Sequence, residues 1–244
     1  AFVVVGIVTP VADGLGVSTA GAGIILTAYA IAYALASPLA VAVTGRMARR
    51  SVLSLALLLF LAGSVLSALS ASLLMLTLSR VLVAIGAALY TPAAAGVAVA
   101  ISAPENRGRA LATVFGGLTL AQVVGVPAGA WLAYRWGWNS TFWAVAALAA
   151  AGLALLYSAT PRNIPSQPSS VATTLKSLAD WRLSFAIAFT ATFLGSIYLV
   201  FTYFGPLIEA SLGANPELRT GFLVLFGIGA VAGNYIGGFL TDRI

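Results

Sequence analysis

Long hydrophobic runs separated by short polar turns make up most of this chain. A bilayer core about 30 Å thick needs about 20 helical residues to cross it. Runs that approach or exceed this length occupy residues 20–44, 51–70, 73–101, 110–134, 140–158, 183–208 and 219–240. Residues 1–12 form a further apolar run that is too short to cross alone, and we interpret it as the second half of a helix whose start is missing. The pattern predicts an all-α polytopic membrane protein.

A short charged turn occurs twice, each time directly after a long apolar run. The first copy spans residues 46–50 and the second spans residues 238–243, so that Arg46 aligns with Arg243. Internal repeats in a chain of membrane helices are typical of secondary transporters, which are built from related bundles. The repeat therefore predicts two bundles of helices and a transport function.

Composition supports the membrane interpretation independently. A soluble globular domain carries about 25% charged residues, whereas this chain carries 7% and is 61% hydrophobic. The net charge of +6 would suggest a nucleic-acid partner in a soluble protein. Because no basic run is interleaved with stacking aromatic residues, we expect no nucleic acid. The lipid bilayer is the expected surrounding.

The chain contains no cysteine and no histidine, which removes thiolate and imidazole chemistry. We therefore expect no enzymatic activity, no metal site and no cofactor. A proton carrier would have to be a carboxylate or lie outside this segment. The acidic residues all fall in loops or at span ends: Asp13, Glu105, Asp180, Glu209, Glu217 and Asp242.

Basic residues are distributed unequally between the two sets of loops. If the chain enters from the cytoplasm, the opposite loops hold only Arg135 and Arg219. The cytoplasmic connections then hold the larger group: Arg46, Arg49, Arg50, Arg107, Arg109, Arg162, Lys176, Arg182 and Arg243. Cytoplasmic loops of membrane proteins carry an excess of Lys and Arg, so this distribution predicts the orientation.

Prolines and serines interrupt the hydrophobic pattern between residues 159 and 182. Such a composition favours an extended linker. We expect residues 1–158 to form an N-terminal six-helix bundle with a truncated first helix, residues 159–182 to form a cytoplasmic linker, and residues 183–244 to begin a C-terminal bundle.

Several short motifs occur in an order that resembles the major facilitator superfamily, specifically its twelve-helix drug:proton antiporter branch with arabinose- or nucleoside-efflux-type permeases. Residues 238–243 match the family's loop motif, while the first copy is degenerate, with Gly45 at the usual aspartate position. The residues from Arg80 to Gly86 resemble the fourth-helix motif. Further similarity lies in residues 104–110, 125–129 and 201–206.

The resemblance implies a chain that covers about helices 1–8 of twelve. It also implies a monomer in the bacterial inner membrane that exchanges a small-molecule substrate for protons. In such a transporter two bundles rock around a cavity near the bilayer midplane.

Arg80 is a charged residue inside a predicted span. Such a residue costs about 2.5–3.5 kcal/mol on insertion scales, so it should face a cavity or a polar partner. Its depth in the span matches the depth of Gln122 in the next, antiparallel span, which makes a hydrogen bond or a shared cavity feasible. Bracing of the bundle by Arg80 and interhelical bonding by Gln122 are the alternatives.

Tyr29 and Tyr33 are four residues apart, so they share a helix face and could line an amphipathic pocket. Asn234 lies in the last span and is a further candidate for the substrate cavity. Packing or lipid contact for the tyrosines, and a bond between helices for Asn234, are the alternatives.

Small residues recur at steps of four in the fifth span, at Gly117, Ala121, Gly125 and Gly129, where they would let helices approach closely. Pro127 removes an amide donor and bends the helix. The resemblance implies that Gly125, Pro127 and Gly129 help to close the cavity. Tight packing without gating is the alternative.

The charged turns supply the remaining candidate gating residues: Arg46, Arg49, Arg50, Gly238, Asp242 and Arg243. The first three follow the end of a span, where cations complement the helix dipole. A carboxylate at the end of a helix is unfavourable for that dipole, so Asp242 needs a partner. The resemblance implies that its contact is a latch, made in one access state and broken in the other.

We therefore expect an exporter of small amphipathic molecules, similar to drugs, sugars or nucleosides, that works by proton antiport. An uncoupled facilitator is the alternative within transport. A non-transporting membrane receptor is a further alternative.

Overall fold

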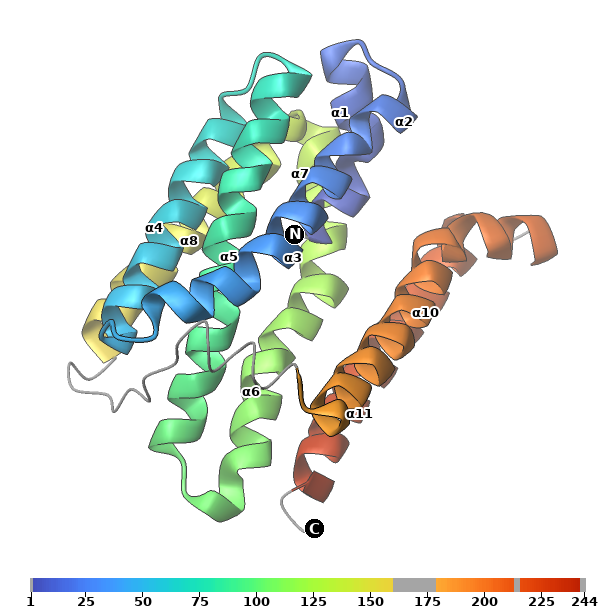
Figure 1. Ribbon diagram of the computed structural model, residues 1–244. Helices are drawn as coiled ribbons and strands as arrows, with labels where there is room; N and C mark the ends of the chain where they lie inside the picture. The colour runs from blue at the N-terminus through green and yellow to red at the C-terminus, as the bar shows by residue number, and fades with distance from the viewer. Residues whose placement is uncertain (1, 160–178, 213–215, 242–244) are drawn as a thin grey trace.

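The computed structural model describes residues 2–159, 179–212 and 216–241. The gating candidates Asp242 and Arg243, and most of the predicted linker, lie outside the described residues. Throughout the described part the chain forms helices joined by short turns (Figure 1). The prediction of an all-α membrane fold is confirmed.

The helices follow the predicted hydrophobic runs closely. They are η1 (Phe2–Ile7), α1 (Val8–Leu15), α2 (Thr19–Ala22), α3 (Ile24–Thr44), α4 (Arg49–Ala68), α5 (Leu73–Ile101), η2 (Pro104–Asn106), α6 (Arg107–Leu120), η3 (Ala121–Gly125), α7 (Val126–Trp136), α8 (Trp138–Ala159), α10 (Trp181–Leu212) and α11 (Pro216–Thr241). Within the described residues, five helical segments are long and apolar enough to cross a membrane: Thr19–Thr44, Arg49–Ala68, Leu73–Ile101, Pro104–Trp136 and Trp138–Ser158.

The turns between these helices have recognisable causes. Ser72 caps α5, since its hydroxyl accepts a hydrogen bond from the backbone N–H of Met75 at 3.2 Å. A serine in this position satisfies one of the amides that a helix start leaves without a partner. Gly137 separates α7 from α8 with a φ of 84°, a conformation that a residue with a Cβ rarely adopts. Ser72 and Gly137 therefore mark two of the boundaries between spans.

Helix α5 packs against α3 and α4, and α4 packs in turn against α8. Glycines permit the close contact of α4 with α5. A Cβ on Gly86 would lie 2.8 Å from the carbonyl oxygen of Ala56. Inside the same contact the hydroxyls of Ser67 and Ser79 form a buried hydrogen bond of 2.7 Å. Close backbone approach and small polar residues are how helices associate in lipid, where no hydrophobic force drives them together.

The chain crosses repeatedly between two ends of the molecule. In Figure 1 the α3–α4 and α5–α6 turns and the end of α11 lie at the lower end, whereas the α4–α5 turn and the α1–α2 turn lie at the upper end. The arginine-rich α3–α4 and α5–α6 turns thus share one end of the molecule. Helices α10 and α11 run beside each other, and α11 lies against α6.

Candidate functional site

The strongest candidate site is the arginine in the interior of the bundle. Arg80 on α5 is 2% exposed. Its guanidinium carbon lies 5.2 Å from the ring centroid of Tyr29 on α3 and 5.6 Å from that of Phe142 on α8. Within the described part of the chain, its Nε atom is buried and has no hydrogen-bond partner. Three helices thus place a permanent positive charge between two aromatic rings, and such contacts contribute about 2 kcal/mol when desolvated.

A second tyrosine extends this aromatic group. Tyr33 stacks on Tyr29 with ring centroids 6.2 Å apart and an angle of 14° between the ring planes. Both rings are half-buried. Their spacing of four residues places them on one face of α3, as the sequence indicates. The site therefore combines a cation with a phenol pair.

Phe142 was not predicted from the sequence. It lies one helical turn after Trp138, and the two rings meet edge to face at 6.0 Å between centroids. Phe142 is fully buried. A spacing of four residues between aromatics in an apolar run is the only signal for it, and that signal equally fits lipid contact.

Gln122 lies in the short π-helical segment in the middle of its predicted span. It is half-buried in η3, a π-helical turn between α6 and α7, and this turn contacts η1. A hydrogen bond or a shared cavity between Arg80 and Gln122 stays a prediction.

The π-helical turn has a local cause. In a regular α-helix the amide of residue 127 would bond to the carbonyl of residue 123, but Pro127 has no amide hydrogen. The turn ahead of it widens to π geometry, which often marks functional positions in membrane helices. Pro127 itself is exposed and Gly125 is half-buried.

The glycines of the segment from α6 to α7 do not all allow another helix to approach closely. A Cβ on Gly129 would overlap the side chain of Val3, and the Thr141 hydroxyl donates to the Gly129 carbonyl at 2.8 Å. By contrast, Gly117 has nothing within 4 Å of a Cβ position, and the nearest atom to Gly125 belongs to its own helix. The expected close approach therefore holds at Gly129 and fails at the other two glycines.

Helices α6 and α11 meet along small residues. Asn234 donates its side-chain amide to the Ala112 carbonyl at 2.7 Å. A Cβ on Gly238 would lie 2.5 Å from the Cβ of Ala112. At the end of this contact the Arg109 guanidinium lies 4.9 Å from the ring centroid of Phe239. Asn234 thus joins two helices, the alternative that the sequence left open for it.

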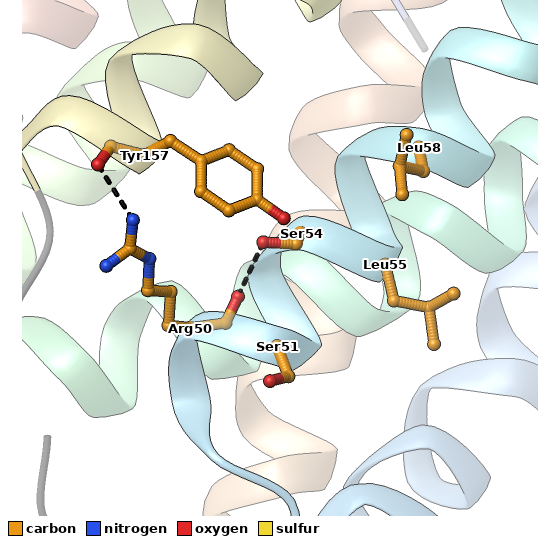
Figure 2. A pocket seen from close by; sticks show the side chains of 6 residues that line it. All are labelled: Arg50, Ser51, Ser54, Leu55, Leu58 and Tyr157. Carbon is orange, nitrogen blue, oxygen red and sulfur yellow. Dashed lines mark hydrogen bonds between the residues drawn. The ribbon is translucent and has the colours of Figure 1, made fainter. Parts of the chain in front are cut away.

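The arginines of the first charged turn differ in position from the expectation. Arg46 is exposed in the turn, but Arg49 and Arg50 are the first residues of α4. The expectation that these two arginines complement a helix dipole was wrong, because they lie at a helix start, where the dipole favours negative charge. Arg50 instead reaches the end of α8, where it donates to the carbonyl of Tyr157 at 2.7 Å and lies 5.0 Å from its ring centroid (Figure 2).

The opposite ends of the same two helices are also joined. Asn139, near the start of α8, donates its side-chain amide to the carbonyl of Ala68, the last residue of α4, at 2.7 Å. Each contact satisfies a carbonyl that a helix end leaves without an internal partner. Arg50 and Asn139 therefore fasten α4 to α8 at both ends.

An all-helical bundle with several segments long and apolar enough to cross a membrane, and with a buried cation among aromatic rings, defines a polytopic membrane protein. The comparisons with known proteins agree. The Major Facilitator Superfamily model matches residues 1–244. The chain belongs to the major facilitator superfamily.

Known relatives and structures are similar along most of the chain. The inner membrane transport protein YdhP of Escherichia coli is 33% identical over 98% of this chain and 61% of its own length. The chloramphenicol resistance protein of Streptomyces lividans is 31% identical over 99% of the chain and 63% of its own length. The proton:xylose symporter XylE has the same fold, with a TM-score of 0.73 at 15% identity over 96% of this chain and 64% of that one. The chain thus spans about three fifths of the length of the relatives that it matches.

Proposed function

We propose that this chain belongs to a secondary active transporter that exports small amphipathic molecules, similar to drugs, sugars or nucleosides, by proton antiport. The observation that carries the proposal is the burial of Arg80 between Tyr29 and Phe142. A charged side chain in the membrane is costly and is retained where it serves a substrate or ion path. The similarity to a chloramphenicol resistance protein supports export.

The same site suggests how substrate would be held. Tyr29 and Tyr33 offer ring faces for an apolar part and hydroxyls for a polar part, while Arg80 supplies positive charge. Gln122 is half-buried in the π-helical turn, which contacts α11, and would border the cavity there. Asn234 would border the cavity at the contact of α6 with α11.

Alternating access would occur by rocking of the two bundles. The contact of α6 with α11 suits such a motion, because small side chains leave few interlocking groups to separate. In this proposal the gating residues are Arg46, Arg49, Arg50, Gly125, Pro127, Gly129 and Gly238, together with Asp242 and Arg243. We place the protein as a monomer in the bacterial inner membrane, which the similarity to an Escherichia coli inner membrane protein supports.

Among the carboxylates whose side chains the structure describes, Asp13, Glu105 and Asp180 are exposed. A guanidinium keeps its proton under physiological conditions. In the proposed mechanism Arg80 therefore acts through its fixed charge on the substrate or on a nearby acid, and does not itself carry the proton.

The test is transport by the purified protein in proteoliposomes with an imposed pH gradient, using dyes, sugars and nucleosides as candidate substrates. Efflux that rises with the gradient and collapses with a protonophore supports antiport. Flux that ignores the gradient favours the uncoupled facilitator. Absence of flux for every substrate class, with the protein folded, favours the non-transporting receptor.

A further inference from the structure

A pocket lies at the arginine-rich end of the molecule, between α4 and α8 (Figure 2). Its volume is about 320 Å³. The residues that line it are Arg50, Ser51, Ser54, Leu55, Leu58 and Tyr157. None of them belongs to the group around Arg80, so the pocket is separate from the proposed substrate site.

One end of this pocket is built from hydrogen-bond donors and positive charge. One nitrogen of the Arg50 guanidinium donates to the Tyr157 carbonyl, while Nε is buried and has no hydrogen-bond partner among the residues that the structure describes. A guanidinium carries five N–H donors in a fixed fork, a geometry that matches phosphate oxygens. The exposed hydroxyl of Ser51 lies on the same turn of α4. No lining residue is a carboxylate, so this end favours an anion.

The other end is apolar and open to the surroundings of the bundle. Leu55 is 39% exposed and Leu58 is 47% exposed, five and eight residues after the arginine. The Tyr157 ring, 56% exposed, borders both ends. In a membrane, exposed leucines on a spanning helix contact acyl chains. A donor-rich end at the arginine-rich edge of the bundle and an apolar strip beside it match the two parts of a phospholipid.

We propose that this pocket binds an anionic phospholipid of the cytoplasmic leaflet, with its phosphate on Arg50 and an acyl chain along Leu55 and Leu58. The cytoplasmic leaflet carries anionic lipids, and arginines near its surface attract them. A free phosphate would satisfy the polar end alone. The exposed leucines are the reason to assign a lipid.

The test is lipid retention by the purified protein in native mass spectrometry, with phosphatidylglycerol and phosphatidylcholine of the same acyl chains as probes. We expect preferential retention of phosphatidylglycerol, and a reduction of about fivefold in Arg50→Gln. Arg46→Gln is the matched control, because it removes an equal charge from an exposed position in the same turn.

Arg50→Gln also breaks the bond to α8, so a second variant separates lipid binding from folding. Ser51→Asp places a carboxylate at the pocket and at the third position of α4, where the helix dipole favours it. We expect it to preserve thermal stability and to reduce phosphatidylglycerol retention.

Three results would overturn the proposal. The first is unchanged retention in both Arg50→Gln and Ser51→Asp. The second is an equal loss in Arg46→Gln, which would indicate general surface attraction. The third is displacement of phosphatidylglycerol by millimolar glycerol phosphate, which would assign the site to a soluble anion. Transport is not measured here, so failure of this proposal and failure of the transport proposal are distinguishable.

Discussion

Arg80→Met separates the functional role of the buried cation from its structural role. Methionine is similar in length and fills the same space without charge. The substitution removes two cation–π contacts, at 5.2 and 5.6 Å, that together contribute about 1–4 kcal/mol. It also removes the cost of a charge in the membrane, about 2.5–3.5 kcal/mol. These terms oppose each other and are similar in size, so we expect the free energy of unfolding to change by less than about 2 kcal/mol.

Transport should respond differently. If the Arg80 guanidinium binds the substrate, its loss removes a hydrogen bond to a charged group, which contributes about 1.5–3 kcal/mol. This corresponds to a loss of more than about tenfold in transport at low substrate concentration. The assay is efflux from proteoliposomes, together with thermal unfolding of each variant. Arg135→Met is the control, because Arg135 is exposed at the end of α7. Full transport by Arg80→Met would refute the assignment, and loss of transport with loss of folding would make Arg80 a bracing residue.

Three further substitutions test the helix contacts. Gly238→Val should force α11 away from α6 and slow efflux severalfold, whereas Gly237→Ala, with open space around its Cβ, should leave efflux unchanged. Equal effects in the two would contradict the proposed gating contact. Gly129→Val should lower the free energy of unfolding by about 1–3 kcal/mol through overpacking, and Gly117→Ala should not lower it, as thermal unfolding will show. Asn139→Ala should lower it by about 1 kcal/mol by removing the bond to the end of α4, and an unchanged melting temperature would show that water replaces this bond.

The spans could be predicted from the sequence because each depends on a local property. The run at residues 73–101 coincides with α5, since hydropathy and a serine cap together fix its start. The position of Arg80 inside a span could likewise be predicted, since it is a charge in an apolar run. Both inferences need only the cost of polar groups in lipid.

The partners of these residues could not be predicted, because they depend on how the helices are rotated about their axes. Phe142 reaches Arg80 through the packing of α8, and no pattern within α8 distinguishes it from a lipid-facing residue. Gln122 lies in a π-helical turn, which the hydrophobic pattern of its span did not predict. Arg50 was assigned to the wrong helix end because the turn before α4 is shorter than the apolar run suggests.

The two hydrogen bonds that join α4 to α8, one at each end, have a consequence for the study of motion in this protein. Sliding by one residue along the axis would shift either helix by about 1.5 Å and break the hydrogen bonds at both ends together. Helices α4 and α8 should therefore move as one rigid body. Spin labels or fluorophores on α4 and α8 would keep a constant separation. That distance would be an internal reference for measuring any displacement of α11.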